Sequence, residues 1–261
     1  VLIVGLMIGC KSDGVNTNTT SSTGPIFSQV SAASSGIDFV NEIIESPERS
    51  MGNYENFFSG AGVAVGDINN DGLADIFFTS NDASNRLYLN KGGMQFEDIT
   101  AAAGLSSNKW SGGCSMVDVN NDGYLDIYIS RNGESMNPED RKNQLYINNQ
   151  DLTFTESAMA YGLADAGYST QAVFFDMDND GDLDMYQVNQ PADQKLFIRY
   201  NITAENSKFF THKLYRNDNG RYRDVSFKSG LSQIFAYGLS VNASDLDNDG
   251  WIDLYVANDY D

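Results

Sequence analysis

The 261-residue chain has the composition of a folded, globular and strongly acidic protein. Hydrophobic residues make up 41% of it and aromatic residues 12%, which is too apolar for a compositionally disordered chain. Its 36 acidic and 16 basic residues give a net charge of -20, so nucleic acids and anionic membrane surfaces are excluded as electrostatic partners and cations are favoured. Fifteen of the acidic residues lie in four nine-residue windows, so we expect a metal partner.

The first residues form a short apolar segment that ends in a cysteine. Apolar residues and glycine run from Val1 to Gly9, Cys10 follows, and a stretch rich in Ser, Thr and Asn begins at Lys11. The run is shorter than the roughly 20 residues that span a bilayer. Residues 1–10 resemble the end of a bacterial lipoprotein signal peptide, with Cys10 as the lipidated residue and residues 11–25 as a flexible tether. An ordinary secretory segment or a cloning remnant is the alternative.

This N-terminal pattern predicts an exported protein. We expect a lipoprotein of the cell envelope or outer surface, with a periplasmic or secreted protein as the alternative. Membrane contact is then expected only through the lipid anchor.

Four acidic windows recur along the rest of the chain. They begin at Asp67, Asp118, Asp176 and Asp245, so their starts are 51, 58 and 69 residues apart (67 to 118, 118 to 176 and 176 to 245). The windows read DINNDGLAD, DVNNDGYLD, DMDNDGDLD and DLDNDGWID. The spacing is typical of a four-stranded blade and not of a helical hairpin repeat.

Short β-branched and aromatic runs flank every window, and they are too short for helices. We predict strands before the windows at 62–66, 115–117, 172–175 and 239–242, and after them at 76–79, 127–130, 185–188 and 254–257. A second hairpin is predicted from 86–90 with 95–99, from 144–148 with 153–155, and from 213–217 with 221–225. Each unit is therefore expected to hold four antiparallel strands, with the window joining the first two.

The windows carry the donor pattern of a calcium loop. Calcium prefers six to eight hard oxygen ligands, and a short loop can supply them from alternate positions if a glycine allows a sharp bend. We predict side-chain ligands at positions one, three, five and nine and a backbone carbonyl at position seven. The predicted ligands of the four calcium ions are Asp67, Asn69, Asp71, Leu73 and Asp75; Asp118, Asn120, Asp122, Tyr124 and Asp126; Asp176, Asp178, Asp180, Asp182 and Asp184; and Asp245, Asp247, Asp249, Trp251 and Asp253.

Other interpretations of the windows fit less well. An EF-hand needs a Glu at position twelve and flanking helices, but position twelve holds Phe78, Ile129, Gln187 or Val256 and the flanks read as strands. Dockerin-like and thrombospondin-like calcium loops recur at much shorter intervals. Four metal-free acidic turns would crowd three to five carboxylates into one turn, which mutual repulsion disfavours.

Together, the windows, the glycine-rich first strand and the Leu-Tyr third strand resemble the FG-GAP (VCBS-type) repeats of integrin α-subunit propellers and bacterial surface proteins. The pattern from Phe to Gly-Leu at 96–105 and 154–163, with 222–231 as a variant, is similar to the ASPIC/UnbV-associated branch. The resemblance covers residues 26–261. It implies an all-β propeller of four-stranded antiparallel blades, usually seven, and it implies much less about the ligand.

About four blades are present, so we expect an incomplete ring. The predicted blades are 59–105, 110–163, 168–231 and 237–261, the last of which ends after its second strand. Residues 26–37 resemble a fourth strand and its following turn, and we expect them to close the ring. The sequence is thus expected to be part of a longer protein, and a compact four-bladed ring is the alternative.

Variation concentrates on the face that is predicted to lie opposite the calcium loops. The longest insertion, 189–211, carries aromatic and arginine residues that are typical of interfaces, although an insertion folded onto its own blade is an equally open alternative. Trp110, Tyr168 and Tyr237 each precede a window by eight residues, where packing between blades is favoured over a ligand-stacking ring. The partner-binding candidates are Trp110, Tyr168, Tyr237, Phe197, Tyr200, Phe209 and Phe210.

Two functions are compatible with these features. The favoured one is a non-enzymatic binding or adhesion module that recognises a protein or a glycan and uses calcium as a structural ion. The alternative is a propeller-type polysaccharide lyase or hydrolase whose catalytic residues lie partly outside this chain. One histidine and the lack of a nucleophile elbow in the sequence disfavour the enzyme.

Overall fold

The computed structural model describes residues 27–52, 57–133, 135, 137–190, 207–231 and 237–259. The chain divides into two compact units, Val1–Ser31 and Ala32–Asp261. Of the first unit, residues 27–31 are described, and they adopt neither helix nor strand. The second unit contains the helices and strands. Among the described residues, no helix combines the length and the hydropathy that crossing a membrane requires.

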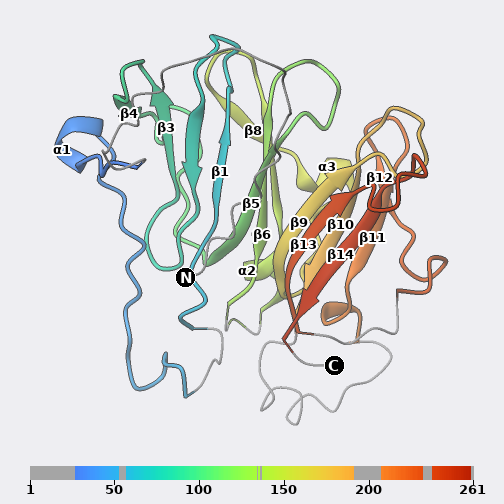
Figure 1. The fold of residues 1–261 in the computed structure, drawn as a ribbon. Helices are drawn as coiled ribbons and strands as arrows, with labels where there is room; N and C mark the ends of the chain where they lie inside the picture. The colour runs from blue at the N-terminus through green and yellow to red at the C-terminus, as the bar shows by residue number, and fades with distance from the viewer. Residues whose placement is uncertain are drawn as a thin grey trace, which may run out of the picture. The chain divides into compact units, whose positions relative to one another are not determined.

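The described part of the second unit forms four antiparallel sheets that follow one another along the chain (Figure 1). Three sheets have four strands, paired in chain order, and the fourth has two. The strands are β1 (Val63–Gly66), β2 (Asp75–Phe78), β3 (Arg86–Asn90) and β4 (Phe96–Asp98); β5 (Ser111–Val117), β6 (Asp126–Arg131), β7 (Gln144–Asn148) and β8 (Phe154–Glu156); β9 (Ser169–Phe175), β10 (Asp184–Asn189), β11 (Lys213–Asn217) and β12 (Tyr222–Asp224); and β13 (Gly238–Ser244) and β14 (Asp253–Asn258). The predicted all-β fold with propeller-like blades is confirmed, and the blade number of a closed ring stays a prediction.

The predicted strand boundaries agree best with the structure in the third strands, where side chains alternate around a Leu-Tyr pair. The third strands β3, β7 and β11 have the predicted bounds. The first strands β5 and β9 begin four and three residues earlier than predicted (111 against 115, 169 against 172). These extensions are polar or glycine-rich and lack strand propensity, but a neighbouring strand overrides such local preferences.

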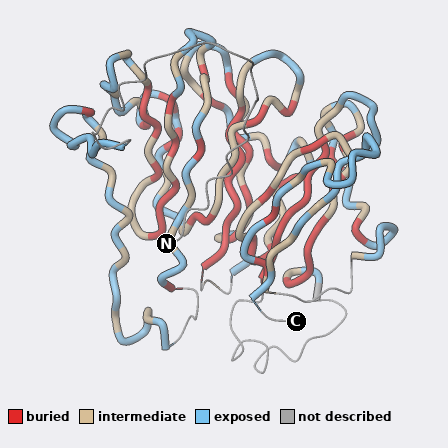
Figure 2. The backbone as a smooth tube through the Cα atoms, in the orientation of Figure 1, coloured by how far each residue is buried: buried red, intermediate tan, exposed pale blue. Residues whose placement is uncertain are grey.

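Among the described residues, three hydrophobic cores join neighbouring sheets, and Figure 2 marks the buried stretches of the backbone in red. The first core joins Phe77 and Leu87 to Ile127 and Ile129 of the next sheet. The second and third cores continue the series between the second and third and the third and fourth sheets. As a result β6 and β10, which lie inside their sheets, are buried along their whole length.

The first strands of successive sheets lie side by side: β1 with β5, β5 with β9, and β9 with β13. Glycine allows this close approach, because a Cβ on Gly62 would lie 2.8 Å from the Cys114 nitrogen and one on Gly113 would lie 2.7 Å from the Thr170 oxygen. The sheets therefore share an inner edge made of first strands, which is the arrangement of propeller blades.

The prediction that residues 26–37 form a ring-closing strand is corrected, because the described residues of this segment do not form a strand. Residues 27–31 have no regular structure, and the short helix α1 (Ala32–Ser35) follows. The end of the motif does behave as in the blades: Gly36 has a φ of 78° and packs on the Phe96 carbonyl, as Gly162 (φ 82°) packs on that of Tyr222. The turn at Gly36 requires only a contact with the neighbouring blade. A fourth strand must instead pair with the third strand of its own sheet, and no such strand precedes residue 27 in the described chain.

In the described segments between strands there are three further short helices. They are α2 (Pro138–Arg141), α3 (Ala158–Tyr161) and the 3-10 helix η1 (Ser207–Phe209).

Candidate functional site

The four acidic windows form four copies of one loop, each joining the first two strands of a sheet. In every copy the carboxylate at position one accepts hydrogen bonds from the backbone N–H groups of positions five and six, at 2.7–3.2 Å. In the first loop the acceptor is Asp67, and the donors are Asp71 and Gly72. These bonds curl the backbone around the first carboxylate.

The backbone of the loop needs two left-handed residues. Position six is glycine, with φ between 84° and 92°, as expected for a sharp bend. Position four is asparagine in all four loops, at Asn70, Asn121, Asn179 and Asn248, with φ between 57° and 61°. Asparagine tolerates this conformation better than most residues, so the Asn repeated at position four is a further sequence signal for the left-handed turn.

The Asp at position nine anchors the loop to the sheet. In the second loop, Asp126 accepts hydrogen bonds from the backbone N–H groups of Val119 (3.1 Å) and Asn148 (2.8 Å), the latter at the end of β7. Asp75 and Asp184 make the same two kinds of bond, and all three carboxylates are fully buried.

Sequence reasoning missed the partner of this anchor. The third strands end in Asn90, Asn148 and Asn217, whose side-chain amides also donate to the carbonyl of loop position eight at 2.8–3.1 Å. The Asn that closes each Leu-Tyr strand was the available signal.

Burial changes the ionisation of the position-nine carboxylates. Desolvation raises the pKa of Asp126 to about 6, although its two backbone hydrogen bonds act in the opposite direction. Desolvation likewise raises the pKa of Asp75 and of Asp184, and neighbouring loop carboxylates add to the effect. A nearby cation favours the charged form of such a group.

The carboxylates converge in the two most acidic loops. Oxygens of Asp176, Asp178 and Asp184 lie within 4.8 Å of one another, and so do oxygens of Asp245, Asp247 and Asp249. The first set contains positions one, three and nine, and the second contains positions one, three and five. In the first two loops, the position-three amides of Asn69 and Asn120 donate to the position-five carboxylates at 2.9 and 3.1 Å.

This donor set fits a calcium ion. Every predicted side-chain ligand atom is a hard oxygen. A carboxylate oxygen has two lone pairs, so an oxygen that accepts one hydrogen bond from a backbone N–H keeps a second lone pair for a metal ion. The residues that would hold the ions are those predicted from the sequence. The position-seven carbonyls stay predictions, although their N–H groups donate to position five at 2.8–2.9 Å in all four loops.

Adjacent loops are also bonded to one another. The Asn70 amide donates to the Gly123 carbonyl of the second loop at 2.9 Å. The Asn121 amide donates to the Gly181 carbonyl and to the Asp182 carboxylate of the third loop, both at 3.4 Å. In the first and second loops, the position-four Asn therefore contacts the ligand-bearing turn of the next loop.

Two of the predicted aromatic partner-binding residues, Tyr168 and Phe210, are internal. Tyr168 and Phe210 are 1% and 2% exposed and stack on each other with ring centroids 5.6 Å apart. The buried Arg141 guanidinium lies 4.0 Å from the Tyr168 ring centroid. For Tyr168 this agrees with the packing that is favoured above over a ligand-stacking ring. For Phe210 it agrees with the alternative in which the insertion folds onto its own blade.

The remaining aromatic candidates are less buried. Trp110 is half-buried between Phe57 and the Arg49 guanidinium, with centroid distances of 5.6 and 5.7 Å. Phe209 and Tyr237 are also half-buried. Phe197 and Tyr200 lie outside the described residues, as does the lipidation candidate Cys10.

Comparisons with known proteins agree with the repeat. Residues 54–129 and 135–186 match the model of the FG-GAP-like repeat, and these ranges include the first three acidic windows. Cartilage acidic protein 1 from Mus musculus is 26% identical over 210 residues, covering 77% of this chain and 29% of the relative. Its Homo sapiens counterpart is 25% identical over 205 residues, covering 77% and 28%. The chain thus spans less than a third of the length of these relatives.

Solved structures match as well. One of them is an Agrocybe aegerita protein described as specifically recognising non-reducing terminal N-acetylglucosamine, with 17% identity and a TM-score of 0.37 over 73% of this chain and 44% of that one. The matched repeats, the four acidic loops and the antiparallel blades place this chain in the FG-GAP-like repeat family.

Proposed function

We propose that this chain is a calcium-stabilised β-propeller module that binds a protein or a glycan for an exported protein of the cell envelope. The observation that carries the calcium part is the fourfold repetition of one loop geometry, with carboxylate oxygens within 4.8 Å of one another in the third and fourth loops. Acidic side chains without a counter-ion would repel one another at such distances. A divalent cation removes this repulsion.

Calcium bound at these loops would be structural. An ion that binds only the folded chain stabilises it by about 2.7 kcal/mol per site when its free concentration is 100 times Kd. Each loop joins two strands, and Asn70 and Asn121 link neighbouring loops, so ordering one loop supports the next blade.

Thermal unfolding tests the calcium role. We expect the full chain to melt well above its chelator-treated form when calcium is present, and magnesium at the same concentration to restore much less, because it prefers smaller octahedral sites. Equal melting temperatures with calcium and with chelator would refute the structural role.

The binding role rests on the fold and on chemistry outside the loops. The blades expose strand ends and connecting loops on the face away from the acidic windows, and this is where the chain varies in length between repeats. A glycan array and a capture experiment with the calcium-loaded chain test this role. Retention of neither glycans nor proteins would contradict it.

The exported location rests on the Cys10 pattern. We expect metabolic labelling with a fatty acid to mark the protein in a bacterial host and Cys10→Ser to abolish the label. A labelled Cys10→Ser protein would contradict the assignment of the lipid to this residue.

The enzymatic alternative has no supporting observation in the described residues. The single histidine of the chain, His212, is 1% exposed, and its Nδ1 lies 2.7 Å from the Tyr186 hydroxyl across β10. This histidine is packed within the blade, beside Tyr186 of β10.

A further inference from the structure

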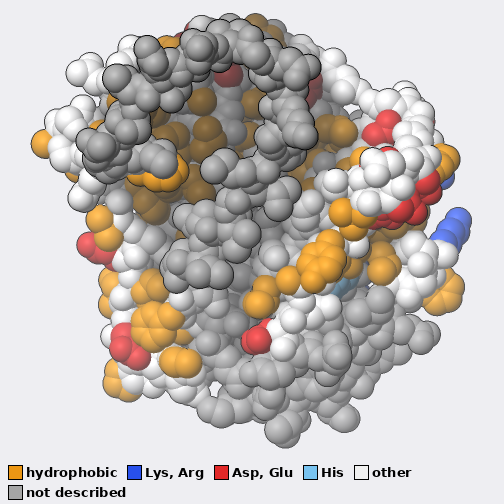
Figure 3. Space-filling model, viewed as in Figure 1, with side chains coloured by type: hydrophobic (Ala, Val, Ile, Leu, Met, Phe, Trp, Pro, Cys, Tyr) orange, Lys and Arg blue, Asp and Glu red, His pale blue; other side chains and the backbone are white. Residues whose placement is uncertain are grey.

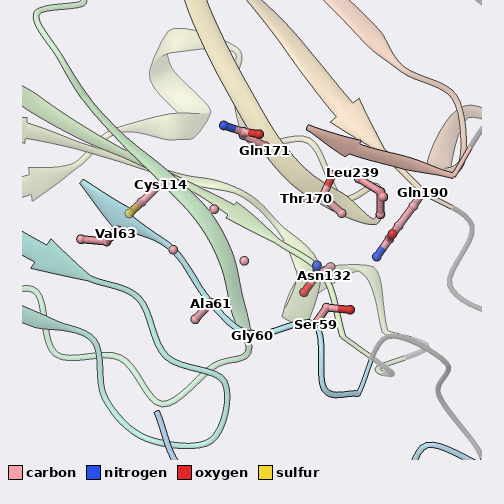
Figure 4. Close-up of a pocket in the computed structure, with 13 residues that line it drawn as sticks. Ser59, Gly60, Ala61, Val63, Cys114, Asn132, Thr170, Gln171, Gln190 and Leu239 are labelled. Atoms are coloured by element: carbon pink, nitrogen blue, oxygen red, sulfur yellow. The ribbon is translucent and has the colours of Figure 1, made fainter. Parts of the chain in front are cut away.

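A pocket of about 410 Å³ lies where the inner strands of all four sheets come together (Figure 4). Its wall is formed by the segment that leads into β1, the start of β5, the residue after β6, the start of β9, the residue after β10 and the start of β13. The volume falls within the range of about 300–1,000 Å³ that is usual for small-ligand sites. Every blade contributes to the pocket.

The lining is uncharged in a chain whose net charge is -20. Among the described residues that form it, none is acidic or basic. Its polar groups are amides and hydroxyls, and its apolar side chains include Val63 and Leu239, which are 57% and 52% exposed. Such a surface offers no charge to a charged ligand and suits a neutral ligand that has both hydroxyl groups and an apolar face.

Bare backbone makes up much of the wall. Gly62 and Gly113 are required by the close approach of the inner strands, because a Cβ on either would clash with the backbone of the next strand. Their presence is thus explained without a ligand. The consequence is nevertheless that a ligand can approach the main chain closely at these positions.

One buried polar atom in the pocket lacks a partner. The Asn132 side chain is 8% exposed, and its Oδ1 accepts no hydrogen bond from any residue that the structure describes. A buried, unsatisfied acceptor costs about 1–3 kcal/mol, so it marks a place where a hydroxyl donor would be stabilised. In Figure 4 Asn132 lies with Ser59, Thr170 and Gln190 at one end of the pocket, where amide and hydroxyl groups gather.

The neighbouring polar groups are held in place by the fold. Thr170 Oγ1 lies 3.2 Å from the Val188 carbonyl and 3.0 Å from the Gly238 carbonyl, so it joins the third and fourth sheets. Gln190 is 2% exposed, and its backbone N–H donates to the Tyr168 carbonyl at 2.9 Å. A ligand that meets these groups therefore meets a preorganised surface, which lowers the entropic cost of binding.

We propose that this pocket binds a single neutral sugar residue, with a hydroxyl donating to Asn132 Oδ1 and the apolar face of the ring against Leu239. A pyranose ring combines vicinal hydroxyls with a CH face and matches the mixed, uncharged lining. This inference rests on the proposed binding function and narrows its ligand class from protein or glycan to a neutral glycan.

The first test is binding of free sugars to the full chain in saturating calcium. Saturation-transfer NMR with a panel of neutral monosaccharides and with glucuronic acid should show contact with one or more neutral sugars and none with the acid. Contact with glucuronic acid alone, or with a peptide library and no sugar, would overturn the proposal.

Two pairs of variants locate the site. Asn132→Leu removes the acceptor at nearly constant size and should weaken Kd for the bound sugar by about tenfold without lowering the melting temperature, because no hydrogen bond of the described chain is lost. Leu239→Trp should block the pocket, whereas Ser240→Trp, at the next residue of β13 and equally open to solvent, should leave binding unchanged. Sugar binding that survives both Asn132→Leu and Leu239→Trp would overturn the proposal.

The calcium melt separates this proposal from the function on which it rests. A chain that calcium stabilises and that captures a protein, but that binds no neutral sugar, would refute the pocket assignment and leave the proposed module intact. A chain that neither responds to calcium nor binds any ligand would refute the proposed function as well.

Discussion

The second and fourth acidic loops share Asp at positions one, five and nine, Asn at position four and Gly at position six, but the surrounding strands hold them differently. Asp126 of the second loop is fully buried and accepts two backbone hydrogen bonds, one of them from β7. Asp253 of the fourth loop is exposed, and among the described residues its one donor is the Leu246 N–H at 2.9 Å. The bonds inside the loop are local, whereas its anchoring comes from a third strand.

The same contrast extends to the strands behind the loops. β6 is buried throughout because sheets lie on both of its faces, while β14 is exposed or half-buried at every position. Within residues 1–261, two loops with the same Asp, Asn and Gly pattern therefore lie on strands that are packed to different extents, and matched substitutions in this chain can break or sharpen the comparison.

The largest difference is expected for the apolar residue that follows position nine. Ile127→Ala opens a cavity in a fully buried core and should cost about 2–5 kcal/mol of unfolding free energy. Leu254→Ala, at the equivalent position of the half-buried β14, should cost less than half as much. Urea denaturation of the two variants measures the difference, and equal losses would mean that the fourth sheet is as well packed as the second.

A smaller difference is expected at the anchoring carboxylate. Asp126→Asn replaces one acceptor oxygen with a donor, so one buried N–H group loses its partner at a cost of about 1–3 kcal/mol. Asp253→Asn should change stability by no more than about 0.5 kcal/mol, as at other exposed sites. Both variants should be unfolded with urea in excess chelator, so that loss of ion binding does not contribute. A larger loss for Asp253→Asn would contradict the anchoring role of β7.

The smallest difference is expected between position-four asparagines. Asn70→Gly keeps the left-handed backbone and removes the bond to Gly123, which should cost about 0.5–1.5 kcal/mol. Asn248→Gly is the matched control, because Asn248 has the same backbone conformation and its side chain bonds to no neighbouring loop in the described chain. Chemical denaturation of both variants gives the value of the cross-loop bond, and identical stabilities would show that the loops are energetically independent.

Local chemistry allowed the loops and most strands to be predicted from the sequence. The Asp and Gly spacing specifies the turn, and the bonds from Gly72 and Asp71 to Asp67 connect residues at most five positions apart. The third strands were predicted to the residue because their Leu-Tyr pairs alternate between two packed faces.

Long-range contacts account for what the sequence did not reveal. The bond from Asn148 to Asp126 spans 22 residues, and the one from Asn70 to Gly123 spans 53. The sequence left two alternatives open for Phe210, because an insertion rich in aromatic residues can form a surface or fold back, and only the stacking partner Tyr168 decides between the two. The pocket around Asn132 draws residues from all four sheets and has no local motif.

Terbium titration of the chelator-treated full chain tests most directly whether these loops bind an ion. Position seven is Tyr124 in the second loop and Trp251 in the fourth, so tyrosine- and tryptophan-sensitised emission, with Tyr124→Phe and Trp251→Phe as controls, reports on the two loops separately. We expect saturable emission from both loops, and added calcium should abolish it by displacing the terbium. The fourth loop should bind terbium with lower affinity than the second, because β14 anchors it less. Absence of sensitised emission, or emission that calcium does not displace, would contradict this expectation.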